Sequence, residues 1–182
     1  MLLLLHSRTA LLIQAALLIA ASMIVPSPLS QEPPKSPASS ESLIGKKLPD
    51  FNLSDLNGKK VRFSNFTGKV ILLDFWATWC PDCREVVGHI QEMSARSRDT
   101  GLAVVTVSVD TRPETVKNFM EKNTFTFPVL MAAEDTRMVF QVKRIPTVYL
   151  VDRSGVVRAM FVEYGMKGVP ELESQVKKLL GR

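Results

Sequence analysis

The sequence predicts an α/β domain with a mixed central sheet flanked by helices. Two nearly continuous apolar runs, 70–76 (VILLDFW) and 102–109 (LAVVTVSV), are typical of strands that are covered on both faces. Helical patterns separate these runs, and a hairpin pattern follows near the C-terminus. Strands that alternate with helices indicate parallel pairing, and the final hairpin adds antiparallel strands to the same sheet.

Each element has its own signal. The domain opens with LPDFNLSDLNGKKVRFSNF, where Asn57-Gly58 is a strong turn signal, so we expect an extra N-terminal β-hairpin before the strand at 70–76. A second hairpin is expected where strands 147–151 and 156–162 flank the turn at 152–155. Apolar spacing predicts helices over 81 to about 98, over 113–122, over 135–142, and at the C-terminus, where the apolar positions are Val169, Leu172, Val176 and Leu179.

The chain of 182 residues divides into three predicted parts: 1–25, 26–42 and 43–182. The first contains an apolar run, 10–25, that would span only ~24 Å as a helix, against the ~30 Å hydrocarbon core of a bilayer. It fits a secretory signal peptide, while an uncleaved membrane anchor stays open because Leu2–Leu5 lie just before the run. The second part holds five of the 11 prolines and is expected to be a solvated linker. Both alternatives place the 43–182 domain outside the cytoplasm, in the periplasm or on the outer face of the cytoplasmic membrane.

Composition excludes one class of partner. The chain is 46% hydrophobic and 23% charged, as expected for a globular protein, and its formal net charge is +5. The basic residues are scattered and form no run with interleaved aromatic residues, so we expect no nucleic-acid partner.

The only two cysteines lie in WCPDC, at Cys80 and Cys83. Pro81 is favourable at the first position of a helix, so Cys80 is expected at the helix N-terminus, where unpaired N–H groups stabilise a thiolate. Cys83 follows one turn later on the same face, which lets the sulfurs approach. A purely structural disulfide is disfavoured, because closing so small a loop removes little entropy from the unfolded chain. A zinc site is disfavoured because His6 and His89 are the only histidines, and we expect neither metal nor cofactor. The pair is therefore predicted to be redox-active, with Cys80 as the nucleophile.

The stretch 73–84 (LDFWATWCPDCR) resembles the active-site region of thioredoxin-like proteins. The N-terminal segment, the linker and the first hairpin narrow the resemblance to the membrane-associated TlpA/ResA-like disulfide reductases, over nearly all of 43–182. This resemblance implies a thioredoxin-like fold, a Cys80–Cys83 disulfide in the oxidised form, protein disulfides as substrates and an upstream membrane electron donor.

A second motif supports the same family. Residues 144–147 (RIPT) precede a predicted strand, and in the family this proline is cis and faces the dithiol. The resemblance therefore predicts that Ile145, Pro146 and Thr147 bind the backbone of the partner. Trp79 and Pro81 are expected to add contact surface beside the sulfurs.

Asp74 is predicted to be the third catalytic residue. It interrupts an apolar strand, and burial there should raise its pKa. It matches the buried acid of thioredoxin, and this resemblance implies that Asp74 acts as a base for the second cysteine. Many TlpA/ResA-like proteins have asparagine here instead. They also often have Glu and Pro where this chain has Val86 and Gly88. Asp82, between the cysteines, should disfavour a thiolate and so favour reduction of the partner.

Two other functions remain as alternatives. A thiol peroxidase of the peroxiredoxin superfamily would show Pro-x-x-x-Thr-x-x-Cys, but this chain has Leu73 and Ala77 at the Pro and Thr positions. A copper-binding metallochaperone module of the same fold would use CxxxC with a distant histidine, whereas this chain has CxxC and no histidine in its C-terminal half.

Overall fold

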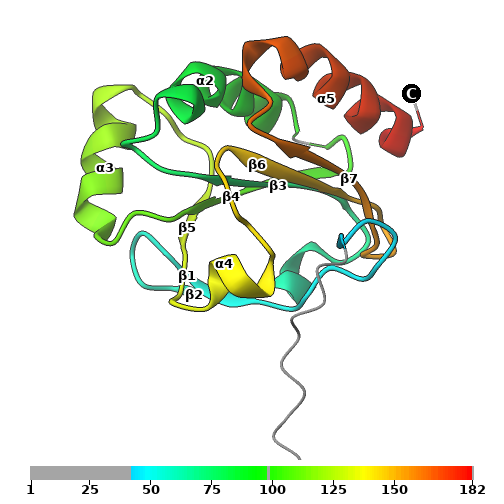
Figure 1. Ribbon diagram of the computed structural model, residues 1–182, viewed down its shortest axis with the longest axis horizontal. Coiled ribbons are helices and arrows are strands. Elements are labelled where there is room, and N and C mark those ends of the chain that lie inside the picture. Colours follow the sequence, from blue (N-terminus) through cyan, green and yellow to red (C-terminus); the bar gives the residue numbers. More distant parts are fainter. Residues whose placement is uncertain (1–41, 98, 182) are drawn as a thin grey trace, which may run out of the picture. The chain divides into compact units, whose positions relative to one another are not determined.

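A computed structural model describes residues 42–97 and 99–181 (Figure 1). The predicted segment at 1–25 and nearly all of the predicted linker at 26–42 lie outside the described residues. The strands are β1 (Asn52–Asp55), β2 (Lys60–Arg62), β3 (Val70–Trp76), β4 (Leu102–Ser108), β5 (Val129–Met131), β6 (Thr147–Val151) and β7 (Val157–Val162). The helices are η1 (Phe63–Phe66), α2 (Pro81–Arg96), α3 (Pro113–Lys122), α4 (Thr136–Val139) and α5 (Gly165–Leu180).

The strands form one mixed sheet in the order β2-β1-β5-β4-β3-β6-β7. Strands β3, β4 and β5 are parallel, whereas the β1–β2, β1–β5, β3–β6 and β6–β7 pairs are antiparallel. All residues of β3 and β4 are buried, as their apolar sequences predict. The predicted thioredoxin-like α/β fold with an extra N-terminal hairpin is therefore confirmed.

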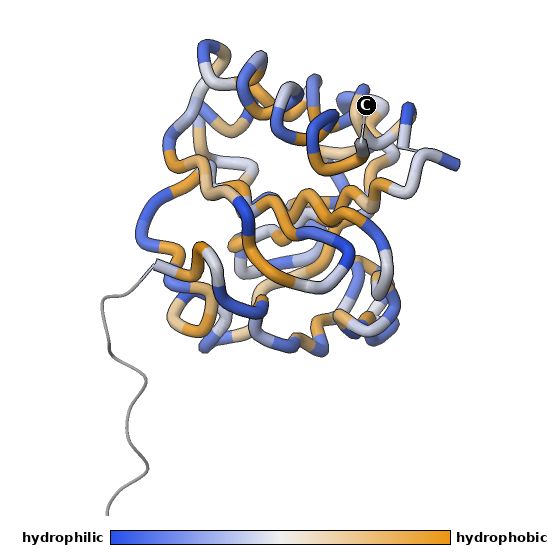
Figure 2. Tube along the Cα trace, turned by 90° about the vertical axis from the view of Figure 1, so that its right-hand side faces the viewer, coloured by the Kyte–Doolittle hydropathy of each residue, from blue (hydrophilic) through white to orange (hydrophobic). Residues whose placement is uncertain are grey.

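Each face of the sheet packs against its own hydrophobic core. On one side, which we call the α2/α5 face, β3 contributes Leu72 and Trp76, and helices α2, α3 and α5 cover them. On the other side β3 contributes Ile71, Leu73 and Phe75, which pack against β1 and the segment around α4. Figure 1 shows α2 and α5 on one side of the sheet and α4 on the other, and Figure 2 shows hydrophobic residues following the strands through the middle of the domain.

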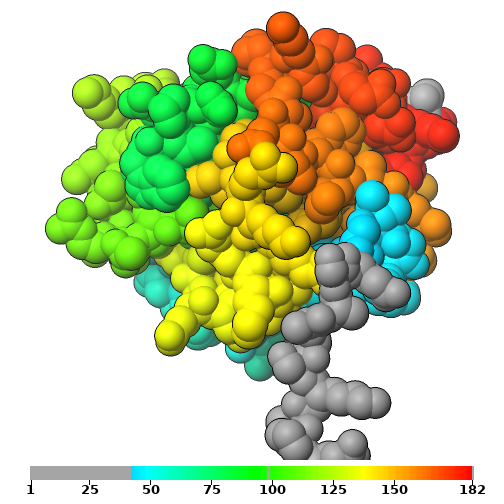
Figure 3. All heavy atoms as spheres, viewed as in Figure 1, coloured from blue at the N-terminus to red at the C-terminus, as the bar shows by residue number. Residues whose placement is uncertain are grey.

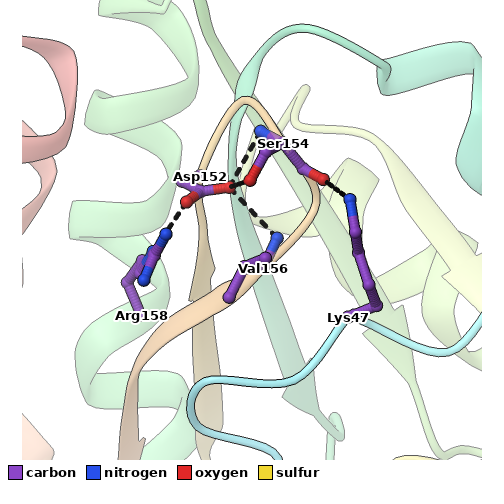
Figure 4. Close-up of polar contacts among 5 residues, drawn as sticks. All are labelled: Lys47, Asp152, Ser154, Val156 and Arg158. Atoms are coloured by element: carbon purple, nitrogen blue, oxygen red, sulfur yellow. Dashed lines mark hydrogen bonds and ion pairs between the residues drawn. The ribbon is translucent and has the colours of Figure 1, made fainter.

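The β6–β7 hairpin is closed by one carboxylate (Figure 4). Asp152 accepts hydrogen bonds from the Ser154 hydroxyl, from the backbone N–H groups of Ser154 and Val156 and from the Arg158 side chain. Burial alone would raise the pKa of Asp152, but these hydrogen bonds outweigh it and hold the pKa well below its usual range. The Lys47 ammonium donates to the Ser154 carbonyl, which ties the N-terminal segment to the turn. The turn predicted at 152–155 thus has a clear electrostatic cause.

The segment that leads into the domain also pairs with β7. The Gly45 N–H donates to the Val157 carbonyl at 2.8 Å, and the Leu48 N–H donates to the Gly155 carbonyl at 2.9 Å. This pairing covers the beginning of an edge strand whose backbone groups would otherwise be open to another chain.

The structure differs from the sequence-based expectation in two places. The helix expected over 135–142 is only the short α4, because Phe140 leaves the helix and Gln141 adopts a positive φ of 54°. Strand β5 was not predicted, since its three residues gain strand structure from pairing with β1 and β4. No helix among residues 42–97 and 99–181 is long and apolar enough to cross a membrane.

Candidate active site

Cys80 and Cys83 form a disulfide at the N-terminus of α2, with their Cα atoms 5.3 Å apart. Cys80 is the N-cap residue, Pro81 is the first residue of the helix, and the Cys80 sulfur accepts the Cys83 N–H at 3.2 Å. The helix therefore directs one of its unpaired N–H groups at the sulfur that the sequence predicts to be the nucleophile. Cys80 is 5% exposed and Cys83 is 1% exposed, so an incoming disulfide meets Cys80 first.

The loop before β6 lies beside the disulfide. The Ile145–Pro146 peptide bond is cis, as the resemblance implied, and the Cys80 sulfur is 3.9 Å from the Ile145 carbonyl oxygen. This is a contact and not a hydrogen bond, because a disulfide sulfur has no hydrogen. The next segment in contact is the β7–α5 corner, where the Glu163 N–H donates to the Pro146 carbonyl at 2.8 Å and the Glu163 carboxylate pairs with Arg144 at 2.6 Å. In Figure 3 the surfaces of α2 (green), the segment before β6 (yellow) and the β7–α5 corner (orange) adjoin on one face.

Asp74 lies in the middle of β3 and is 1% exposed. Side chains alternate along a strand, so Asp74 shares the α2/α5 face with Leu72 and Trp76, and Cys83 belongs to the same core. Its cross-strand neighbours are Thr106 and Val148, and Oδ1 has no hydrogen-bond partner among the described residues. Burial raises the pKa of Asp74 from 3.8 to about 7. A carboxyl with that pKa can both accept and return a proton near neutral pH.

A second buried carboxylate holds the loop before Cys80. Asp110 follows β4 and accepts hydrogen bonds from the Thr78 N–H at 2.9 Å, the Thr78 hydroxyl at 2.7 Å and the Ser108 hydroxyl at 2.7 Å. These bonds fix the residues that lead into α2, so Asp110 is a positioning residue for Cys80. The sequence alone does not single out Asp110. The available signal was an acidic residue two positions after a buried strand.

The predicted contact residues do not all face the solvent. Trp79 is 64% exposed next to Cys80, and Pro81 is also exposed. Ile145 is half-buried, while Pro146 and Thr147 are buried. The Thr147 hydroxyl donates to the Arg144 carbonyl at 2.6 Å, and its backbone lies in β6 between β3 and β7. Of the predicted contact residues, Trp79 and Pro81 are therefore exposed beside the sulfurs and Ile145 is partly so.

Within residues 42–97 and 99–181 no three side chains of the metal-binding types His, Cys, Asp and Glu come together as a metal site would require. The site is built around the Cys80–Cys83 disulfide.

Comparison with known proteins agrees with this geometry. Residues 44–160, which include both cysteines and the cis proline, match the AhpC/TSA family. The thiol-disulfide oxidoreductase ResA of Bacillus cereus is 30% identical over 138 residues, which cover 75% of this chain and 78% of that protein. The thioredoxin-like protein YneN of Bacillus subtilis is 34% identical over 121 residues, covering 65% of this chain and 71% of that protein.

Among solved structures, a Chlorobium tepidum protein described as a thiol:disulfide interchange protein DsbE superposes with a TM-score of 0.72 at 33% identity. The match covers 78% of this chain and all of that one. The sequence match, the shared fold and the cysteine pair at the start of α2 all indicate the same family. The chain belongs to the AhpC/TSA family and, within it, to the thioredoxin-like thiol-disulfide oxidoreductases.

Proposed function

We propose that this thiol-disulfide oxidoreductase is exported and reduces disulfides of proteins in the cell envelope. The observation that best supports this function is the position of Cys80, at the N-terminus of α2 and beside the cis-proline loop, with the raised pKa of Asp74 behind it. The AhpC/TSA family match and the ResA and YneN relatives support the chemistry. Export is supported by the apolar run at 10–25 alone.

The reaction proceeds in two exchanges. The Cys80 thiolate attacks a partner disulfide, forms a mixed disulfide and releases the first partner thiolate. Asp74 then takes the proton of the Cys83 thiol. The resulting Cys83 thiolate attacks the Cys80 sulfur, so that the Cys80–Cys83 bond forms and the bond from Cys80 to the partner breaks. Two electrons pass to the partner, whose second thiolate takes up the proton.

The partner lies against the exposed surface beside the sulfurs. Trp79 and Pro81 supply contact surface next to Cys80, and within the loop at 145–147 the Ile145 backbone is open to pair with an extended partner segment, since Pro146 and Thr147 already pair within the domain. Each turnover leaves the protein oxidised, so an upstream electron donor must return two electrons to the Cys80–Cys83 disulfide. A membrane protein fits this role, with residues 10–25 holding the domain at the outer face of the membrane if they are not cleaved.

Trapping of partners tests the exchange. Cys83→Ser removes the resolving thiol, so mixed disulfides on Cys80 should accumulate in cells and appear as adducts on a non-reducing gel. The matched variant Cys80→Ser keeps one thiol but removes the nucleophile and should trap few partners. If Cys83→Ser accumulates no more adducts than Cys80→Ser, the exchange mechanism is wrong.

The reduction potential tests the direction. A potential near ~−270 mV supports a reductase, and one near ~−120 mV would mean that the protein oxidises its partners. A peroxide-consumption assay separates the peroxidase alternative. The two positions of the peroxidase motif are Leu73 and Ala77, which are apolar and 0% exposed, so we expect no peroxide consumption.

A further inference from the structure

Three buried side-chain atoms on the α2/α5 face have no hydrogen-bond partner among the described residues: Asp74 Oδ1, Trp76 Nε1 and Tyr164 Oη. Buried polar groups are normally paired, so each such atom in a folded domain needs an explanation. Asp74 has the proposed proton-transfer role and Trp76 packs among aromatic rings. The proposed disulfide exchange gives Tyr164 no role.

The backbone brings Tyr164 towards the middle of the sheet. It follows Glu163, whose N–H is bonded to the Pro146 carbonyl and whose positive φ of 48° turns the chain into α5. The Tyr164 ring packs on Phe161, with ring centroids 6.3 Å apart. Phe161 pairs across the sheet with Val148, and Val148 pairs with Asp74. Tyr164 thus packs against β7, two strands from β3, on the face of the sheet that also holds Asp74.

A glycine one turn into α5 makes room for this arrangement. A Cβ atom at Gly168 would lie 2.7 Å from the Tyr164 Cβ, a distance that real Cβ contacts essentially never show. The Gly168 N–H also donates to the Tyr164 carbonyl at 2.9 Å. The start of α5 is therefore compatible with Tyr164 in its present position only because residue 168 has no side chain.

The two groups have complementary chemistry. Burial raises the pKa of Tyr164, and the nearby Asp74 carboxylate raises it further, so the phenol keeps its hydrogen and can only donate to the carboxylate. Of the other groups on this side of the sheet, α2 contributes the titratable thiols of Cys80 and Cys83, and the charged side chains at 82, 84, 85 and 167 are exposed. The neighbouring strands contribute Thr106 and Val148, which do not titrate. Two buried donors on this face have no partner among the described residues, Trp76 and Tyr164. Trp76 packs among aromatic rings, which leaves Tyr164 as the candidate to stabilise ionised Asp74.

We propose that Tyr164 is a positioning residue for Asp74: its hydroxyl donates a hydrogen bond to Asp74 Oδ1 and stabilises the carboxylate that takes the Cys83 proton. The bond forms when Asp74 ionises in the reduced protein, whereas both atoms are unpaired in the disulfide form. This inference rests on the proposed function, because it assumes that Asp74 is the proton acceptor of Cys83.

The test is a titration of the Asp74 carboxyl by carbon-13 NMR in the reduced protein, together with the pH profile of single-turnover reduction of a small disulfide. A hydrogen bond to a carboxylate favours the charged form, so Tyr164→Phe should raise the pKa of Asp74 by about one unit and slow exchange about fivefold at pH 7. The rate should recover at higher pH. Gly168→Ala, which displaces the Tyr164 ring, should move the titration in the same direction.

Tyr149→Phe is the matched control. Its hydroxyl donates to the Phe140 carbonyl at 2.6 Å on the opposite face of the sheet, so the Asp74 titration should stay as in the parent protein. An Asp74 titration in Tyr164→Phe identical to that of the parent overturns the inference. Asp74→Asn separates this failure from failure of the proposed mechanism. If Asp74→Asn keeps the parent's rate and pH profile, Asp74 is not the proton acceptor, and both proposals fall.

Discussion

Replacing Asp74 by asparagine should abolish a large part of the pH dependence of folding stability. The carboxyl is 1% exposed, and burial raises its pKa from 3.8 to about 7. Below pH 4 the group is protonated in both the folded and the unfolded protein. Between pH 4 and 7 the unfolded chain releases the proton and the folded protein keeps it, so the free energy of unfolding falls as the pH rises.

The size of the effect follows from the pKa difference. A rise of about 3 pKa units, at about 1.4 kcal/mol per unit, gives roughly 4 kcal/mol of stability lost between pH 4 and pH 7, with no further loss above. Small domains unfold with about 5–15 kcal/mol, so this single group contributes a measurable share. An asparagine side chain cannot ionise, so the unfolding free energy of the Asp74→Asn variant should lack this decrease.

The assay is guanidinium unfolding of the oxidised protein at several pH values from 4 to 8, for the parent and for Asp74→Asn. The oxidised form is used because disulfide-bonded cysteines do not titrate. All other titrating groups are common to both proteins, so the difference between the two curves isolates Asp74. Asp74→Leu provides a second comparison. Its unfolding free energy will differ from that of the parent by another constant amount, but it should also lack the decrease between pH 4 and 7. Parallel curves for the parent and both variants would refute the reasoning.

Three further predictions concern the residues around the site. Asp110→Ala leaves the two Thr78 donors without their acceptor and should lower the unfolding free energy by at least about 2 kcal/mol; an unchanged denaturation midpoint would contradict this role. Gly168→Ala should destabilise α5 through the clash with Tyr164, whereas Gly88→Ala in α2, with nothing within 4 Å of the added Cβ, should stabilise the protein by about 0.5–1 kcal/mol. Equal shifts of the melting temperature in Gly168→Ala and Gly88→Ala would contradict the clash. Trp79→Ala should slow reduction of protein disulfides while sparing small-molecule disulfides and stability, since Trp79 is 64% exposed; equal slowing of both substrates would exclude a docking role.

Local signals in the sequence predicted most of the fold. Strands β3 and β4 are apolar runs that need no partner to be recognised, and α3 begins and ends at the predicted residues. Strand β5 has only three residues and exists because β1 and β4 lie on either side of it. The short α4 ends at a backbone turn with positive φ that its apolar pattern does not reveal.

The candidate site shows the same division. Cys80, Cys83 and Asp74 stand within one short motif, so a single stretch of sequence identifies them together. Asp110 holds Thr78, 32 residues away, and the β7–α5 corner that carries Tyr164 is bonded to the loop before β6. Such partners arise from tertiary contacts, which no local pattern encodes.

Strand β6 separates the reactive sulfurs from the segment that enters the domain. Cys80 touches Ile145, just before β6 begins, while the segment entering the domain at Gly45 pairs with Val157, just beyond the turn that follows β6. The five residues of β6 put about 16 Å between these two ends. The site around Cys80 and the segment entering the domain at Gly45 therefore lie at opposite ends of β6.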